Sequence, residues 1–156
     1  MTKVIAKQMR DEVKSVTGSI QCQGLTSACE AAYKAVDEMY QEGKVILILD
    51  AEAAYNNMNR SQALNTAFRK APQVYTPLYN FYQGSTRGFH AGKELSIEEG
   101  VIQGCSLASA FYDLGMSTLV TETTKQGISQ IWLCDDVSAA GEPNELKAWL
   151  DLLKEK

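Results

Sequence analysis

The sequence has no apolar run long enough to cross a membrane. Its longest uninterrupted apolar segment is Val45 to Leu49, whereas a transmembrane helix needs ~20 such residues. The N-terminal segment MTKVIAKQMRDEVK is amphipathic and charged, so it lacks the apolar core of a secretory signal. Low-complexity tracts, internal repeats and linkers are also missing. We therefore expect an intracellular protein that is not attached to a membrane.

Paired cysteines and a basic excess are missing too. The four cysteines, Cys22, Cys29, Cys105 and Cys134, form no CxxC pair, and without a secretory signal they are interpreted as reduced thiols. The 15 Lys and Arg are outnumbered by 19 Asp and Glu, giving a formal net charge of −4. Free-standing nucleic-acid binders usually carry a basic face. The overall charge therefore speaks against such a binder, but it leaves room for a local acidic site that holds cations.

The apolar pattern that is present predicts one α+β domain. The chain has 156 residues, 45% of them apolar, enough to bury roughly two-thirds of its unfolded surface. Helical spacing of apolar residues and terminal signals predict helices over 3–16, 25–40, 60–71, 74–82, 106–124 and 144–153. Alternating or continuous apolar runs predict a strand over 44–50 and hairpins within 86–100 and 129–140. This order is typical of a small antiparallel sheet packed on helices. The run at 44–50 indicates a central strand covered on both faces.

Three carboxylates lie where strands end. Asp50 closes the apolar strand, and Asp135 and Asp136 stand at the tip of the second hairpin. If the two elements are sheet neighbours, three anions meet, and divalent cations would relieve their repulsion. Oxygen ligands in a partly open site suit Mg²⁺, and two such ions can activate an attacking oxygen and stabilise a leaving one. Alternatively, Asp-Asp is ordinary turn chemistry, and an Asp after a strand starts a turn or caps a helix.

Three segments together resemble the palm motifs of reverse transcriptases, especially those of non-LTR retrotransposons. DAEAAYNNMNR, starting at Asp50, resembles their first motif; GVIQGCSLAS, starting at Gly100, resembles the second; and LCDD, ending at Asp136, resembles the third. The three occur in the family's order and at plausible spacing. The resemblance covers roughly residues 18–150 and implies the palm of an RNA-directed DNA polymerase.

The resemblance also implies roles for single residues. Asp50, Asp135 and Asp136 would be the catalytic, metal-binding carboxylates for Mg²⁺, with Mn²⁺ as a substitute, and the carbonyl of Ala51 would add a ligand. Tyr55 would exclude a ribose 2′-hydroxyl by its volume; by itself it would be taken as a core aromatic. The nucleotide-binding set includes Gln103 and Gly104, which otherwise form a simple helix-initiating turn. The implied partners are an RNA or DNA template-primer and a deoxynucleoside triphosphate.

The chain departs from the family pattern in two places. Cys105-Ser106 replaces the frequent Asp-Pro, and Leu133-Cys134 replaces the frequent Tyr-Ala, so packing beside primer and nucleotide differs while the metal ligands stay.

The resemblance implies little outside the palm. Residues 1–156 are interpreted as a single palm-like domain, with 1–17 a remnant of the fingers and 18–156 the palm core. With the fingers mostly absent and the thumb absent, such a palm would need those segments from elsewhere, or would form a homodimer. Two other functions stay open. One is a non-polymerising palm-fold module for binding or assembly. The other, a nucleotide cyclase-like palm, lacks that family's Gly-Gly-acidic hairpin.

Overall fold

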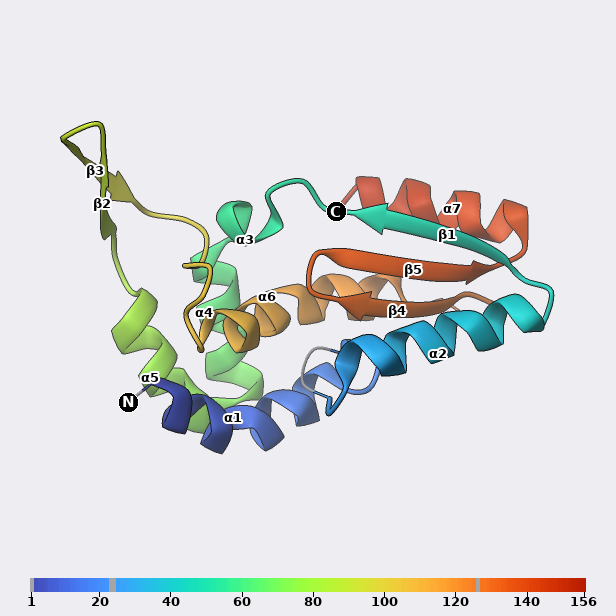
Figure 1. Ribbon diagram of the computed structural model, residues 1–156, viewed down its shortest axis with the longest axis horizontal. Coiled ribbons are helices and arrows are strands. Elements are labelled where there is room, and N and C mark those ends of the chain that lie inside the picture. Colours follow the sequence, from blue (N-terminus) through green and yellow to red (C-terminus); the bar gives the residue numbers. More distant parts are fainter. Residues whose placement is uncertain (1, 23–24, 126) are drawn as a thin grey trace. The chain divides into compact units, whose positions relative to one another are not determined.

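A computed structural model describes residues 2–22, 25–125 and 127–156 of the chain (Figure 1). It separates two compact units: the first contains the segment up to Val16 together with Ala53–Gly115, and the second contains Thr17–Glu52 together with Met116–Lys156. The interpretation of 1–156 as one palm-like domain, with 1–17 as a fingers remnant, stays a prediction. No helix of the described residues is both long and apolar enough to pass through a membrane.

The helices and strands follow the predicted order. The first unit is built from α1 (Thr2–Thr17), α3 (Ala54–Asn57), α4 (Arg60–Lys70), α5 (Pro72–Tyr82), β2 (Thr86–His90), β3 (Lys93–Ile97) and the first half of α6 (Ala108–Thr123). The second unit is built from α2 (Ala28–Gln41), β1 (Val45–Asp50), the second half of α6, β4 (Ser129–Leu133), β5 (Asp136–Gly141) and α7 (Pro143–Lys154). The predicted α+β class with a small antiparallel sheet is confirmed.

The sheet of the second unit has the order β1-β5-β4, and both pairings are antiparallel. β1 therefore lies at an edge, and the prediction of a central strand is wrong. Its alternate side chains explain the difference: Leu47 and Leu49 pack on the core, whereas Ile48 is 68% exposed. A continuous apolar run indicates a strand, but it does not show whether every apolar side chain finds a partner.

Helices cover both faces of this sheet (Figure 1). Val137 and Ala139 of β5 contribute to a buried cluster with Leu146 and Trp149 of α7. Side chains alternate along a strand, so Asp136 and its face-mates point to the opposite face, where α2 contacts all three strands. The second unit is thus a three-layer arrangement, with α7 and the second half of α6 on one face of the sheet and α2 on the other. Asp50 and Asp136 belong to the α2 face.

The two predicted hairpins are both present. β2 and β3 pair around the turn Ala91-Gly92, and β4 and β5 pair around Cys134-Asp135. Two local features differ from the predictions. Ser27, a residue type that commonly caps a helix, precedes α2, but it has a left-handed backbone (φ 54°) and makes no side-chain capping bond. The short helix α3, which follows a left-handed Ala53 (φ 50°), was not predicted.

Candidate active site

Asp50 and Asp136 are direct neighbours across two adjacent strands. The antiparallel register of β1 and β5 ends with Asp50 opposite Asp136. The backbone N–H of Ala51 donates to the carbonyl oxygen of Asp135 at 3.0 Å, so the hydrogen-bonded pair is the next one along. Asp50 and Asp136 therefore form a non-hydrogen-bonded pair, in which the Cα atoms stand only ~4.5 Å apart and the side chains share one face. Both residues are exposed.

Asp135 occupies the two-residue turn that joins β4 to β5. The turn is closed by the pair Leu133 and Asp136, and its first residue, Cys134, has φ 56°. A positive φ at the first central position is what a tight two-residue hairpin requires, and it is uncommon for a residue other than glycine. Asp135 is half-buried, and its carbonyl is fixed by the bond from Ala51.

The structure thus brings two of the three predicted carboxylates together on one face and sets the third beside them in the turn. Within 2–22, 25–125 and 127–156, no three His, Cys, Asp or Glu side chains are grouped to hold a metal ion. The pair itself fits a hard cation, because Mg²⁺ is commonly held by one or two carboxylates while water and substrate oxygens complete its shell. A role of Asp135 and of the Ala51 carbonyl as ligands stays a prediction.

A groove on the α2 face runs up to Asp136. It measures about 320 Å³ and is formed by one face of α2 and all three strands. Its lining is mostly apolar and includes Tyr33, Ile48 and Leu133, with Ser138 and Asp136 as the polar members on β5. The acidic pair is therefore bordered by an apolar surface. This groove was not predictable from the sequence, because β4 and β5 are far from α2 and β1 along the chain.

The remaining predicted residues belong to the first unit, so their approach to the carboxylates stays a prediction. Tyr55 lies in α3, is half-buried, and stacks on Tyr112 of α6 with ring centroids 4.6 Å apart and planes 9° apart. This packing holds the ring in one orientation, as expected for a core aromatic and equally for a rigid wall beside a ligand. Its backbone carbonyl accepts a hydrogen bond from Val101 at 2.7 Å.

The second half of the first motif and the start of the second motif lie side by side. Besides the bond between Val101 and Tyr55, the N–H of Gly100 donates to the carbonyl of Met58 at 2.8 Å. Gly100 has φ +74°, and a Cβ on it would overlap the backbone carbonyl of Asn56. Glycine is needed here both for the left-handed backbone and for the close approach.

Arg60, the last residue of the first motif, also joins the first motif to the second. Only 3% of it is exposed. Its Nε donates to Gly100 O at 2.6 Å, and its Nη1 donates to Gly84 O at 3.0 Å and Ile97 O at 3.2 Å. Its backbone N–H donates to a carboxylate oxygen of Glu99 at 2.9 Å. The burial of this arginine was not predicted, although its place at the end of the first motif was the available signal.

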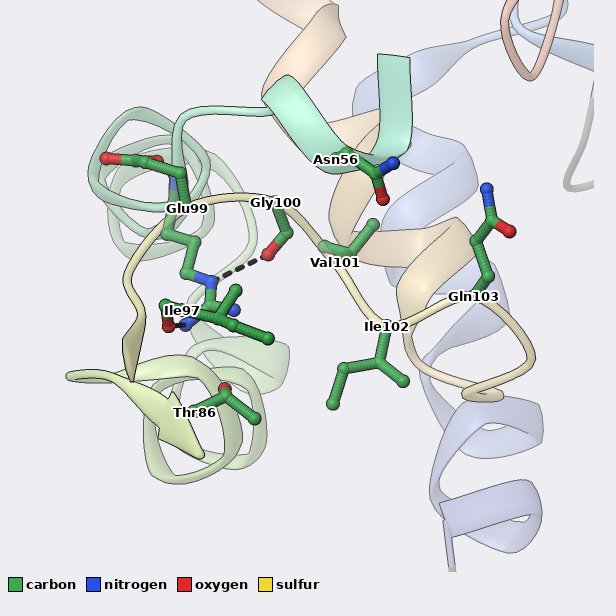
Figure 2. A pocket seen from close by; sticks show the side chains of 9 residues that line it. Asn56, Thr86, Ile97, Glu99, Gly100, Val101, Ile102 and Gln103 are labelled. Carbon is green, nitrogen blue, oxygen red and sulfur yellow. Dashed lines mark hydrogen bonds between the residues drawn. The ribbon is translucent and has the colours of Figure 1, made fainter. Parts of the chain in front are cut away.

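Gln103 lines a pocket of about 390 Å³ at the contact between the two motifs, next to Arg60 and Gly100 (Figure 2). Figure 2 shows Gln103 on one side of the pocket and Thr86 and Ile97 on the other, where the hydrogen bond from Arg60 to the Gly100 carbonyl also lies. Gly104 follows Gln103 with φ +83° and open space where a Cβ would stand. An exposed amide beside a side-chain-free residue gives a ligand room to approach the backbone, as the second motif implies.

Two buried ionisable residues of the first unit were missed by the sequence analysis. Asp113 of α6 is 4% exposed, and burial raises the pKa of its carboxyl from 3.8 to about 7. Tyr82 of α5 stacks on Phe111, and burial, followed by the neighbouring Cys105, raises its pKa far above the usual value. A carboxylate inside an otherwise apolar helix was the signal that could have found Asp113.

No protein-family model and no curated protein sequence matches the chain. Solved structures do match it, among them apo telomerase from Candida tropicalis, truncated from its C-terminal domain. The identity is 15% and the TM-score 0.53; the match covers 99% of this chain and 36% of the telomerase chain. At this identity the similarity concerns the fold alone. The chain therefore shares its fold, distantly, with part of this telomerase, while the resemblance to reverse transcriptases of non-LTR retrotransposons stays a prediction.

Proposed function

We propose that the chain is the palm of an RNA-directed DNA polymerase, most like those of non-LTR retrotransposons. In this reaction a primer 3′-hydroxyl attacks the α-phosphate of a deoxynucleoside triphosphate, a new phosphodiester bond forms, and pyrophosphate leaves. The observation that carries the proposal is the cross-strand pair of Asp50 and Asp136, in a chain with three palm motifs in the family's order. The distant fold similarity to telomerase supports it.

The acidic pair would act by holding cations. Asp50, Asp136 and Asp135, with the carbonyl of Ala51, would bind Mg²⁺ or Mn²⁺, which when bound neutralises charge on the attacking and leaving oxygens. The protein itself supplies position and electrostatics rather than a covalent intermediate. The backbone bond between Ala51 and Asp135 supports this role, because it fixes the end of β1 against the hairpin tip.

Tyr55 and Gln103 would select and orient the nucleotide. A ring stacked on Tyr112 cannot yield easily to a 2′-hydroxyl, and a rigid wall discriminates by clash rather than by attraction. Gln103, on the rim of the Arg60 pocket, would contact the nucleotide or the template base, and Gly104 would leave room for it. We expect Tyr55→Val to incorporate ribonucleotides more readily than the native chain, relative to deoxynucleotides.

Primer extension on an RNA template, with Mg²⁺ and separately with Mn²⁺, tests the proposal. Asp50→Asn and Asp136→Asn are each expected to abolish extension, whereas Asp151→Asn, at an exposed position of α7, should extend like the native chain. Binding of Mn²⁺ measured by electron paramagnetic resonance gives a second readout, and both pair variants should weaken it. Extension that survives in both pair variants would refute the catalytic assignment.

A second function is favoured by one observation: the described residues contain no group of three metal-ligating side chains. A palm-fold module that binds or assembles without polymerising would need no such group. It predicts that the chain binds a primer-template duplex, that Asp136→Asn binds it equally well, and that neither extends the primer.

A further inference from the structure

The two edges of the β1-β5-β4 sheet differ in what covers them. At the β4 edge, the N–H of Trp132 donates to Ile20 O at 2.8 Å, and Gln21 forms a parallel bridge with Trp132. At the β1 edge, β5 is the single partner among the strands of the described residues. The sheet therefore has one edge that is partly covered and one that is open along the whole of β1.

The ladder pattern shows which backbone groups β1 presents at this edge. Because Ala51 bonds to Asp135 on β5, the odd-numbered residues of β1 direct their N–H and C=O groups to β5. The even-numbered residues, Ile46, Ile48 and Asp50, therefore direct theirs outward. Unpaired outward groups of this kind form a template for another strand.

The side chains of β1 do not protect the edge. Natural edge strands are usually blunted by charges, proline or a bulge, but the five residues from Val45 to Leu49 are all apolar and pair with β5 in unbroken register. Val45 is 49% exposed and Ile48 is 68% exposed. Ile48 also lines the α2 groove together with Tyr33, which is 71% exposed, so the apolar surface continues from the edge onto one face.

We propose that β1 is a homodimer interface, at which it pairs antiparallel with β1 of a second copy. Lys44, immediately before the strand, and Asp50, at its end, carry opposite charges. The Lys44 ammonium pairs with Glu42 of its own chain at 2.8 Å, a partly exposed ion pair of little energetic worth that the dimer would exchange for Asp50. In an antiparallel pair centred on Leu47, Lys44 of each copy stands opposite Asp50 of the other, and this charge complementarity occurs twice. The proposal does not depend on the polymerase function.

Alternative registers fit less well. In a symmetric antiparallel pair, residues whose backbone N–H and C=O groups point outward must stand opposite one another. The two-fold axis can therefore pass at Ile46, at Leu47 or at Ile48. A centre at Ile46 sets Asp50 opposite Glu42 of the second copy, and like charges directly opposite are unfavourable. A centre at Ile48 sets Asp50 opposite Ile46. A centre at Ile48 also sets Lys44 opposite Glu52, but Glu52 lies in the turn beyond the strand. Only the Leu47 centre sets Asp50, the charged residue of β1 itself, opposite a residue of the other sign.

This interface closes on itself. The same strand is used by both copies, so the contact is isologous and is satisfied at two chains. The bonds of Ile20 and Gln21 to Trp132 hinder addition at the far edge. The expected species is a discrete dimer rather than a growing fibre.

A cysteine scan tests the register. In a Cys29→Ser background, which removes the exposed native thiol, Ile46→Cys, Leu47→Cys and Ile48→Cys are each oxidised. Only Leu47 faces itself across the axis, as a non-hydrogen-bonded pair with Cα atoms ~4.5 Å apart, within disulfide range. Leu47→Cys should therefore give the covalent dimer far faster than the other two. Faster cross-linking through residue 46 or 48 would overturn the register.

Light scattering over a concentration series tests the dimer itself. The native chain should reach twice the monomer mass, Ile48→Lys should stay monomeric, and Phe89→Lys should dimerise, because Phe89 is equally exposed (71%) but lies on β2. Lys44→Glu should weaken the dimer, and adding Asp50→Lys should restore it with the charges exchanged. A native chain that stays monomeric into the millimolar range, or forms species larger than a dimer, would overturn the proposal.

Discussion

Arg60 donates through Nε to the carbonyl oxygen of Gly100 at 2.6 Å, and this bond ties the end of the first palm-like motif to the start of the second. Arg60 and Gly100 are 40 positions apart along the chain. The same guanidinium lies 5.7 Å from the ring centroid of Tyr82, so its charge is held by carbonyl dipoles and an aromatic face. This buried side chain therefore joins the two motifs alongside the backbone hydrogen bonds from Gly100 and Val101.

Replacing Arg60 by methionine keeps its length but removes its donors. Three backbone carbonyls would lose this donor, among them that of the buried Gly100. An unsatisfied buried acceptor is costly, so we expect the free energy of unfolding to fall by ~3 kcal/mol. Urea unfolding measures this change. Arg69→Met, at an exposed position of the same helix, is the control and should change stability by less than ~0.5 kcal/mol. Equal losses in the two variants would contradict the assigned role.

Gly100→Ala should destabilise the chain more than Gly92→Ala. Both glycines have nearly the same φ, +74° and +76°, so both variants carry the same left-handed strain of about 1 kcal/mol. A Cβ at Gly92 meets nothing within 4 Å, whereas one at Gly100 overlaps the carbonyl of Asn56. We expect a further loss of ~2 kcal/mol for Gly100→Ala, measured as the difference between the two unfolding free energies. A smaller loss at Gly100 than at Gly92 would be inconsistent with the close approach.

Asp113 should make stability depend on pH. Burial raises its pKa from 3.8 to about 7 in the folded chain, so the folded state keeps this proton after the unfolded state has lost it. Stability should therefore fall as the pH rises from about 4 to about 7, by up to ~4 kcal/mol, and then level off.

Asp113→Asn isolates this contribution. The amide cannot ionise, so the variant should lack this fall, and its stability should differ from that of the native chain far more at about pH 8 than at about pH 5. Asp37→Asn, at an exposed position of α2, should keep the native pH profile. Parallel profiles for the native chain and Asp113→Asn would show that this carboxyl does not titrate with a raised pKa.

The elements of the fold were predictable where the signal is local. Helical spacing identified α2 and α7, and turn residues between apolar runs identified the β4–β5 hairpin with its acidic tip. The edge position of β1 was not predictable, because Ile48 is as apolar as a core residue and only tertiary structure leaves it 68% exposed. Ala53 shows the same limit in the backbone, since nothing in its type favours φ 50°.

The candidate site also has features that the sequence predicts and features that it does not. The meeting of Asp50 and Asp136 could be anticipated, because the end of one strand and the tip of a hairpin meet when the two are sheet neighbours. The burial of Arg60 could not, since an arginine at the start of a helix is usually solvated. Its partners, at Gly84 and in the stretch from Ile97 to Gly100, come from two segments that only the folded chain brings to it.

The acidic pair should oppose folding until a cation binds. Two carboxylates directly opposite each other on adjacent strands repel, so Asp136→Asn should raise the melting temperature of the cation-free chain, by the equivalent of ~0.5 kcal/mol. Added Mg²⁺ should reverse this order, because a cation that binds only the folded state stabilises it by ~1.4 kcal/mol at ten times its dissociation constant, and the variant has lost one ligand. Thermal melts with chelator and with increasing Mg²⁺ measure both effects. Asp151→Asn, with its carboxylate on α7, should follow the native chain at each concentration. If the two Asn variants respond to Mg²⁺ alike, the cation is not held by the pair formed by Asp50 and Asp136.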